Sequence, residues 1–287
     1  MTAIIKKEMK NYFNHVTGYV FLFFYTLLSA IFFIQTNVRQ MNADYFHTLI
    51  NSTMIFMLMI PMLTMRLFSE EFSQKTDQLL YTAPITTASI VLGKFFAACL
   101  MLFIGIAVTF IFPFLISPYG TLPIAQIIGT YVGFYLLGCA FISIGILVSV
   151  STHSQVVAAI GSFALIAIFF MMGELMPMVP ATRGAGVVFA ALVSAGLGYV
   201  FYSSTKNIVA SGGFLAALLS FFGIMYIVSP TMYDGLIIRS LRWVSLLSRF
   251  GSFSFGILEV ADMVYYITFS ILFCFFAITI IEKRRWA

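Results

Sequence analysis

Continuous apolar runs recur along the chain, each about as long as the 20 residues that a helix needs to cross a bilayer. A spanning helix satisfies its backbone hydrogen bonds internally, which hydrocarbon requires. Charged residues make up only 9% of the chain, whereas about 25% is typical of soluble domains. A membrane barrel would alternate apolar and polar residues instead. The sequence therefore predicts an all-α, polytopic transmembrane helical bundle.

Eight runs are expected to span the membrane: roughly 18–36, 46–65, 89–116, 125–150, 156–173, 185–203, 208–229 and 262–281. They belong to one transmembrane domain, residues 17–287. Residues 1–16 precede it and place Ile5, Met9, Tyr12 and Phe13 at helical spacing, which predicts an amphipathic helix in the headgroup plane. A plain cytoplasmic tail is the alternative. The first run has no A-x-A-like cleavage site, so we expect it to be retained.

Residues 230–261 are mixed in character, and their Leu236–Leu247 stretch is too short and too charged to span. This outer segment is either an amphipathic helix on the outer face or a re-entrant hairpin packed against protein. Asp234, Arg239 and Arg242 favour the amphipathic helix.

Basic residues fall unevenly on the two sides that eight spans define. Ten Lys and Arg residues lie on the side of the N-terminus and five on the other, and the more basic side is normally cytoplasmic. We therefore expect a multi-pass protein of the cytoplasmic membrane with both termini inside. Several basic side chains are expected to anchor helix ends among the lipid headgroups, namely Lys6, Lys7, Lys10, Lys94, Lys283, Arg284 and Arg285.

The sequence carries no signature of enzyme chemistry. His15, His47 and His153 are far apart, and no zinc, nucleophile-elbow or P-loop motif occurs. The three cysteines lie within apolar runs and are interpreted as buried hydrophobic residues, so we expect no catalytic, cofactor or metal site. The net charge of +5 comes from the ends of apolar runs, which argues against a nucleic-acid partner. The span centres are almost free of ionisable residues, which argues against an ion-coupled carrier.

Residues 66–85 are a polar segment that stands out between the second and third runs. Lys75, Asp77 and Gln78, with Leu79 and Leu80, predict a short amphipathic helix. Pro84 then favours a turn, and the next helix is expected to begin near Thr86 or Thr87. An ordinary solvated loop is the alternative.

At this segment the chain resembles the ABC-2 type permeases, and more narrowly their gliding-motility-associated (Gld-type) branch. The resemblance rests on Arg-Leu-Phe-Ser-Glu-Glu at 66–71, Lys-Thr-Asp-Gln-Leu-Leu-Tyr-Thr-Ala-Pro-Ile at 75–85 and Ile-Val-Leu-Gly-Lys-Phe at 90–95. Two further stretches, 137–159 and 262–286, follow in the family's order. Many members carry Gly-Thr in place of Lys75-Thr76 and Glu in place of Gln78.

The resemblance implies an N-terminal elbow helix, a cytoplasmic coupling helix at about 66–85, and a six-span core of the ABC-2 exporter fold. The hairpin at 185–229 would then be an insertion, or part of a lengthened outer re-entrant region. The residues implied to face an ATP-binding partner are Glu70, Glu71, Lys75, Thr76, Asp77 and Gln78, with Leu79 and Leu80 as anchors. A second cytoplasmic loop would present Thr152, His153 and Gln155.

The resemblance also implies partners. Two copies of an ABC ATP-binding subunit would bind ATP and Mg, while this chain holds no cofactor. A second permease, identical or a related Gld-type chain with an external domain, would complete a dimeric pore among membrane lipids. We therefore expect the permease subunit of an ATP-driven exporter and not an enzyme. The alternative is a membrane-embedded structural or assembly subunit without transport activity. The apolar spans suit lipid-linked molecules, hydrophobic peptides or drugs equally.

Overall fold

The computed structural model describes residues 1–42, 44–76, 85–119, 123–254 and 256–286, and over these residues the regular structure is entirely helical. Seven helices are long and apolar enough to cross a membrane, and a bent helix pair raises the number to eight if it counts as one span. The prediction of a polytopic helical bundle is confirmed. The chain divides into two compact units, Met1–Phe169 with Leu246–Ala287, and Phe170–Ser245.

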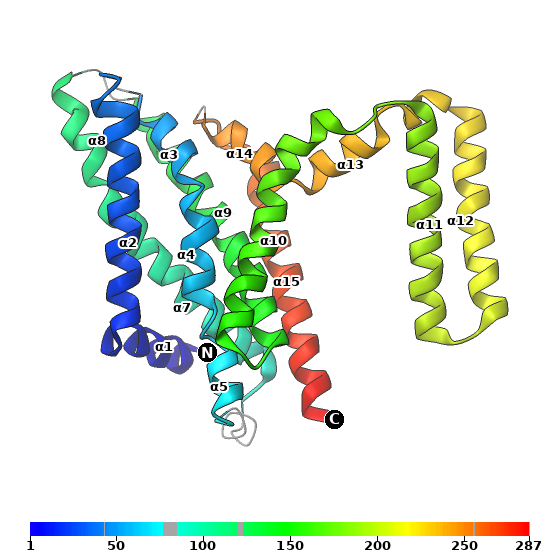
Figure 1. Cartoon of the computed structure of the whole chain (residues 1–287), viewed down its shortest axis with the longest axis horizontal. Coiled ribbons are helices and arrows are strands. Elements are labelled where there is room, and N and C mark those ends of the chain that lie inside the picture. Colours follow the sequence, from blue (N-terminus) through cyan, green and yellow to red (C-terminus); the bar gives the residue numbers. More distant parts are fainter. Residues whose placement is uncertain (43, 77–84, 120–122, 255, 287) are drawn as a thin grey trace. The chain divides into compact units, whose positions relative to one another are not determined.

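Unit 1 contains the two ends of the chain and the helices that surround the long central helix α9 (Figure 1). Its elements are α1 (Thr2–Asn14), α2 (Val16–Phe33), η1 (Ile34–Val38), α3 (Phe46–Ser52), α4 (Ile55–Thr64), α5 (Ser69–Ser73), α7 (Thr87–Thr109), α8 (Ile111–Ile116), η2 (Ser117–Tyr119), α9 (Ile124–Ser151), most of α10 (Gln155–Leu175), α14 (Leu246–Ser254) and α15 (Val260–Trp286).

Helix α9 forms the core of unit 1, and 72% of its most apolar stretch is buried, against 28% for α15. It packs against α4, α7, α14 and α15. Small residues permit these close approaches, because a Cβ added at Gly145 would overlap the Thr64 side chain and one at Gly138 would overlap Leu102. Buried Ser143 and Ser149 lie on the same helix, so small side chains lie where neighbouring helices approach α9.

Helix α1 lies across the foot of α2, and the chain turns between them at His15, which has an extended backbone (Figure 1). The predicted N-terminal helix is therefore present. Its buried residues are Ile4, Glu8 and Tyr12, which recur every four residues and so share one face. Of the predicted apolar face, Tyr12 belongs to this buried row, while Ile5, Met9 and Phe13 flank it and are half-buried.

The second predicted span, 46–65, is bent. Helix α3 meets the following helical stretch, Ile55–Ser73, at 53°. Helix α7 begins where the sequence predicts it, because the Thr86 hydroxyl accepts a hydrogen bond from the Ser89 backbone amide at 3.3 Å and caps the helix.

Segments that the sequence assigns to the cytoplasmic side meet at one end of unit 1. Arg284 Nη2 donates to the Ser151 carbonyl at 3.1 Å, which joins the last turn of α15 to the end of α9. Thr87 Oγ1 donates to Glu282 Oε1 at 2.9 Å and joins the start of α7 to α15. We call this region the terminal end of unit 1, because α1 and the end of α15 both lie there (Figure 1).

Unit 2 is a hairpin of two long helices with three short helices beside it. It comprises η3 (Met176–Met178), α11 (Arg183–Thr205), α12 (Ile208–Val228), η4 (Pro230–Tyr233) and α13 (Leu236–Val244). The hairpin turns at Lys206, which has a left-handed φ of 50°, and at Asn207, whose side chain caps α12. Two hydrogen bonds of 3.1 Å join Arg183 to Asp234 and fasten η4 to α11.

Unit 2 contains the hairpin predicted at 185–229. Both of its long helices, α11 and α12, are long and apolar enough to cross a membrane. The predicted outer segment, 230–261, is divided by the structure, with α13 in unit 2 and α14 in unit 1. In α13 the side chains of Arg239 and Arg242 are exposed while those of Ile237 and Ile238 are half-buried, as in an amphipathic helix.

Candidate functional site

A lysine ammonium is buried at the terminal end of unit 1. Lys94, in the second turn of α7, is only 1% exposed. Its Nζ lies 3.1 Å from Glu8 Oε1 and 2.9 Å from Glu71 Oε1, and it also donates to the Leu67 carbonyl. These three acceptors match the three N–H groups of an ammonium. Full partnering makes such a buried charge tolerable, because unpaired burial is very costly.

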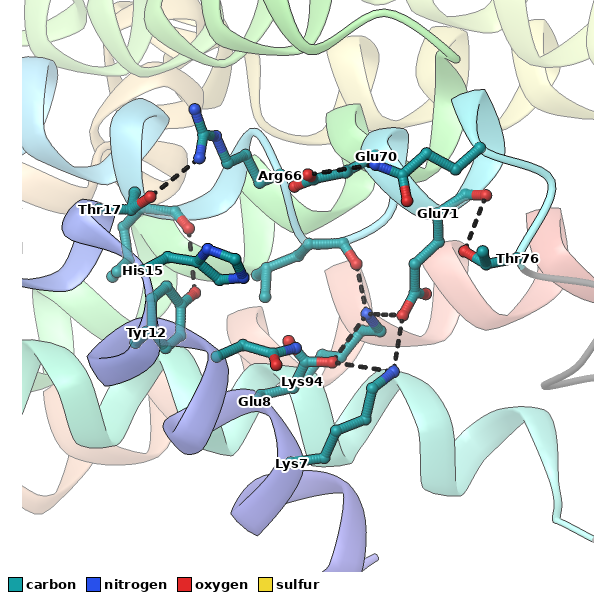
Figure 2. A pocket seen from close by; sticks show the side chains of 14 residues that line it. Lys7, Glu8, Tyr12, His15, Thr17, Arg66, Glu70, Glu71, Thr76 and Lys94 are labelled. Atoms are coloured by element: carbon teal, nitrogen blue, oxygen red, sulfur yellow. Dashed lines mark hydrogen bonds and ion pairs between the residues drawn. The ribbon is translucent and has the colours of Figure 1, made fainter.

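A second lysine closes the cluster. Lys7 Nζ lies 3.1 Å from Glu71 Oε1 and 3.8 Å from Glu8 Oε1, as Figure 2 shows. We call Lys7, Glu8, Glu71 and Lys94 the ion network. Its two positive and two negative charges balance. Burial alone lowers the pKa of Lys7, but Glu71 and Glu8 more than offset this and raise the pKa above its usual value.

The ion network joins three segments that are distant in sequence. Lys7 and Glu8 belong to α1, Glu71 to α5 and Lys94 to α7. The Lys94 ammonium also lies 4.9 Å from the centre of the Phe68 ring, just before α5. Removing the buried Lys94, whose side chain is only 1% exposed, would leave its two carboxylate partners without their buried counter-charge, which typically costs about 3–5 kcal/mol. The network therefore fixes α1, α5 and α7 relative to one another.

The segment around α5 is also fixed to α9. The backbone amides of Phe68 and Ser69 both donate to Ser149 Oγ, at 3.1 and 3.3 Å. Phe72 of α5 lies between His153, with ring centres 5.6 Å apart, and Arg284, 4.8 Å above its ring. The two predicted cytoplasmic loops are thus side by side, and the last turn of α15 contacts both.

The predicted coupling helix is described only in part. Helix α5 covers Ser69–Ser73, and the chain then takes a left-handed φ of 57° at Lys75. Thr76 follows, with its amide donating to the Glu71 carbonyl at 3.0 Å. The helix predicted from Lys75 onward lies mostly outside the described residues, as do Asp77, Gln78, Leu79 and Leu80.

One predicted role is wrong and another stays a prediction. The contact of Glu71 with a partner subunit stays a prediction, and the structure adds that its carboxylate points into the ion network with its side chain only 15% exposed. Lys94 was expected to anchor the helix among lipid headgroups, but it is enclosed by protein. The sequence alone reveals neither environment, because it does not show that α1 brings Glu8 and Lys7 to meet these two residues.

The other predicted residues lie at the same end. Lys6, Lys10, Lys75 and Lys283 are exposed, and Glu70 is half-buried. Thr152 Oγ1 accepts from the Ser154 amide at 3.2 Å, and Gln155 begins α10. The side chain of Arg285 lies outside the described part of the structure.

A cavity of about 350 Å³ opens beside the ion network (Figure 2). It is lined from α1, the start of α2, the end of α4, α5 and α7. Tyr12 closes one side, its hydroxyl donating to the Leu63 carbonyl at 3.0 Å, and burial together with Glu8 raises the pKa of that phenol. Arg66 Nη1 donates to Thr17 Oγ1 at 2.9 Å across the cavity wall.

Sequence reasoning missed Glu8 and the cavity. The available signal was the spacing of Ile4, Glu8 and Tyr12, which puts a carboxylate on one face of the N-terminal helix between two large side chains. Within the described residues no group of three or more metal-ligating side chains occurs. The arrangement is suited to binding a ligand and to joining helices mechanically.

No family model, curated protein or solved structure matches the chain.

Proposed function

We propose that this chain is the permease subunit of an ATP-driven ABC-2 type exporter, with α5 and the residues after it receiving force from separate ATP-binding subunits. One observation carries the proposal. The polar segment that follows the second span is joined by buried contacts to α1 and α7, through the ion network, and to α9, through Ser149. A displacement of this segment would move the ends of several spans together, as rigid-body coupling requires.

Backbone geometry at Lys75 supports the family assignment. Its left-handed φ of 57° is a conformation that favours glycine. The resembling permeases commonly carry Gly at this position, before the same Thr. A left-handed backbone here is the conformation that a glycine at this position would favour, and this agreement supports the proposed family.

The proposal includes the partners that the family would need. Two ATP-binding subunits would supply ATP and Mg, and a second permease, identical or Gld-type with an external domain, would form the other wall of the pore. The exposed Lys75, with Asp77 and Gln78 from the sequence, is the contact we propose for the ATP-binding subunit. Glu71 also provides internal linkage through the ion network.

Co-purification tests the proposal. The affinity-tagged chain would be extracted in mild detergent with the ATP-binding subunit from the same cells. We expect stoichiometric retention by the wild type and loss with Lys75→Glu or Asp77→Lys. Lys283→Glu is the matched control, because Lys283 is equally exposed but lies outside the proposed contact segment. The permease proposal fails if no ATPase is retained, or if all three variants retain it equally.

A structural or assembly subunit remains the second candidate, favoured by the low number of ionisable groups in the spans. Such a subunit would bind other membrane chains without stimulating ATP hydrolysis. An ATPase assay on the co-purified complex separates the two candidates.

A further inference from the structure

Two charged residues that line the cavity have no role in the ion network. Lys7, Glu8, Glu71 and Lys94 compensate one another. Arg66 and Glu70 line the same cavity, yet among the described residues neither takes part in an ion pair. The Glu70 carboxylate accepts a single long hydrogen bond, from Gln74 Nε2 at 3.5 Å, so the cavity offers a ligand one guanidinium and one carboxylate with no ion-pair partner among the described residues.

The position of the cavity favours a membrane lipid as the source of that ligand. Thr17, the second residue of α2, forms part of its wall, so the cavity lies where a candidate span begins. Phe24 lies seven residues beyond Thr17, on the same side of α2, and is 43% exposed. An accessible apolar side chain thus lies two turns along α2 from Thr17, where the acyl chain of a lipid could pack.

We propose that this cavity binds the phosphoethanolamine headgroup of a membrane phospholipid, with its phosphate at Arg66 and Thr17 and its ammonium at Glu70. A guanidinium can hold two phosphate oxygens at once. The hydroxyl of Thr17, already bonded to Arg66 at 2.9 Å, lies beside that position. The volume of about 350 Å³ is within the range of small-ligand sites.

The charges of Arg66 and Glu70 determine which phospholipid headgroup the cavity should prefer. A zwitterion matches one guanidinium and one carboxylate, whereas phosphatidylglycerol would leave Glu70 facing a net negative ligand. Phosphatidylcholine has the right charges, but its quaternary ammonium has no N–H to donate to Glu70. We expect the order phosphatidylethanolamine first, with the other two weaker. This proposal needs only the present chain, so it stands or falls separately from ATP-driven transport.

Native mass spectrometry of the full chain tests the site. The protein would be equilibrated in micelles containing equal amounts of phosphatidylethanolamine, phosphatidylcholine and phosphatidylglycerol. We expect one retained phosphatidylethanolamine. Arg66→Gln should lower retention of all three lipids roughly tenfold, as expected for losing a charged hydrogen bond. Glu70→Gln should remove only the preference for phosphatidylethanolamine over phosphatidylcholine.

Controls keep the test decisive. Lys10→Gln changes an exposed charge on α1 that does not line the cavity, so lipid retention should not change. If Arg66→Gln does not fold, Arg66→Lys replaces it in the test. This variant keeps the positive charge, so it should retain less lipid than the wild type but still retain some. Equal retention by Arg66→Gln and Lys10→Gln, or a preference for phosphatidylglycerol, would overturn the proposal. Displacement of the lipid by soluble phosphoethanolamine at equal concentration would overturn the lipid source.

Discussion

Lys94 is the residue whose surroundings most constrain the terminal end of unit 1. It is buried to 99% and its ammonium meets two carboxylates and one carbonyl. Buried ion networks of this kind add little net stability compared with apolar packing, but breaking one is expensive. The network thus determines that α1, α5 and α7 meet, and separating them costs free energy because it would break buried ion pairs.

Replacing Lys94 should therefore destabilise the fold strongly. We expect Lys94→Met to lower the free energy of unfolding by about 3–5 kcal/mol, because Glu8 and Glu71 lose their buried counter-charge. Adding Glu8→Gln to the same chain should recover part of the loss. Thermal unfolding of the detergent-solubilised protein provides the measurement. Lys10→Met is the control, and an equal loss for both single variants would contradict this account of the network.

Replacing Lys75 with glycine should stabilise the protein, whereas replacing Lys94 should destabilise it. A left-handed backbone costs a non-glycine residue roughly 1 kcal/mol, and Lys75 has a φ of 57° with an exposed side chain. Lys75→Gly should raise the unfolding midpoint. Lys75→Ala keeps the unfavourable backbone conformation and should not. If both variants behave alike, the backbone at this position is not left-handed in solution.

At the scale of single residues, the sequence shows which charged residues lie at the ends of the apolar runs, but not which of them form ion pairs. Lys7, Lys94 and Glu71 stand out as charges at the ends of apolar runs. Their pairing depends on α1 folding back beneath the bundle, and contacts 64 and 86 residues apart close the network. Local patterns carry no information on such distances, so the interface-anchor role for Lys94 was wrong.

At the scale of helices, apolar run length proved to be a reliable guide. The fourth span, predicted at 125–150, is α9 at Ile124–Ser151, and the last, at 262–281, is the central part of α15. The 53° bend in the second span was not predictable. A bend depends on which neighbours pack against each half of the helix, whereas hydropathy measures only whether each half is apolar.

Close helix contact on α9 gives a prediction for glycine. Alanine normally stabilises a helix relative to glycine by up to about 1 kcal/mol. At Gly145 the new Cβ would overlap the Thr64 side chain, so Gly145→Ala should destabilise unit 1 by about 1–3 kcal/mol instead. Gly212 on α12 has no atom within 4 Å of an added Cβ, and Gly212→Ala should be neutral or stabilising. Unfolding midpoints in detergent compare the two, and equal shifts would refute the close α4–α9 contact.

At the scale of the molecule, the chain is a multi-pass helical bundle with an added hairpin. Unit 1 holds both termini and the ion network, while unit 2 contains the end of α10, the hairpin helices, α13 and the short segments beside them. The sequence predicted the hairpin, because runs 185–203 and 208–229 are separated by only a few polar residues, but it placed the whole of 17–287 in one transmembrane domain. It did not predict that the outer segment 230–261 would be shared between the units.

The proposed function requires that the segment after the second span move as one body with α1, because the ion network joins them. Spin labels at Lys10→Cys and Gln74→Cys, both exposed positions, report the distance between them once Cys99, Cys139 and Cys274 are replaced by alanine. The measurement compares the nucleotide-free and ATP-trapped states of the proposed complex with ATP-binding subunits. The account predicts the same distance in both states for the intact network, and a nucleotide-dependent distance after Glu71→Gln. A distance that changes with nucleotide while the network is intact would contradict it.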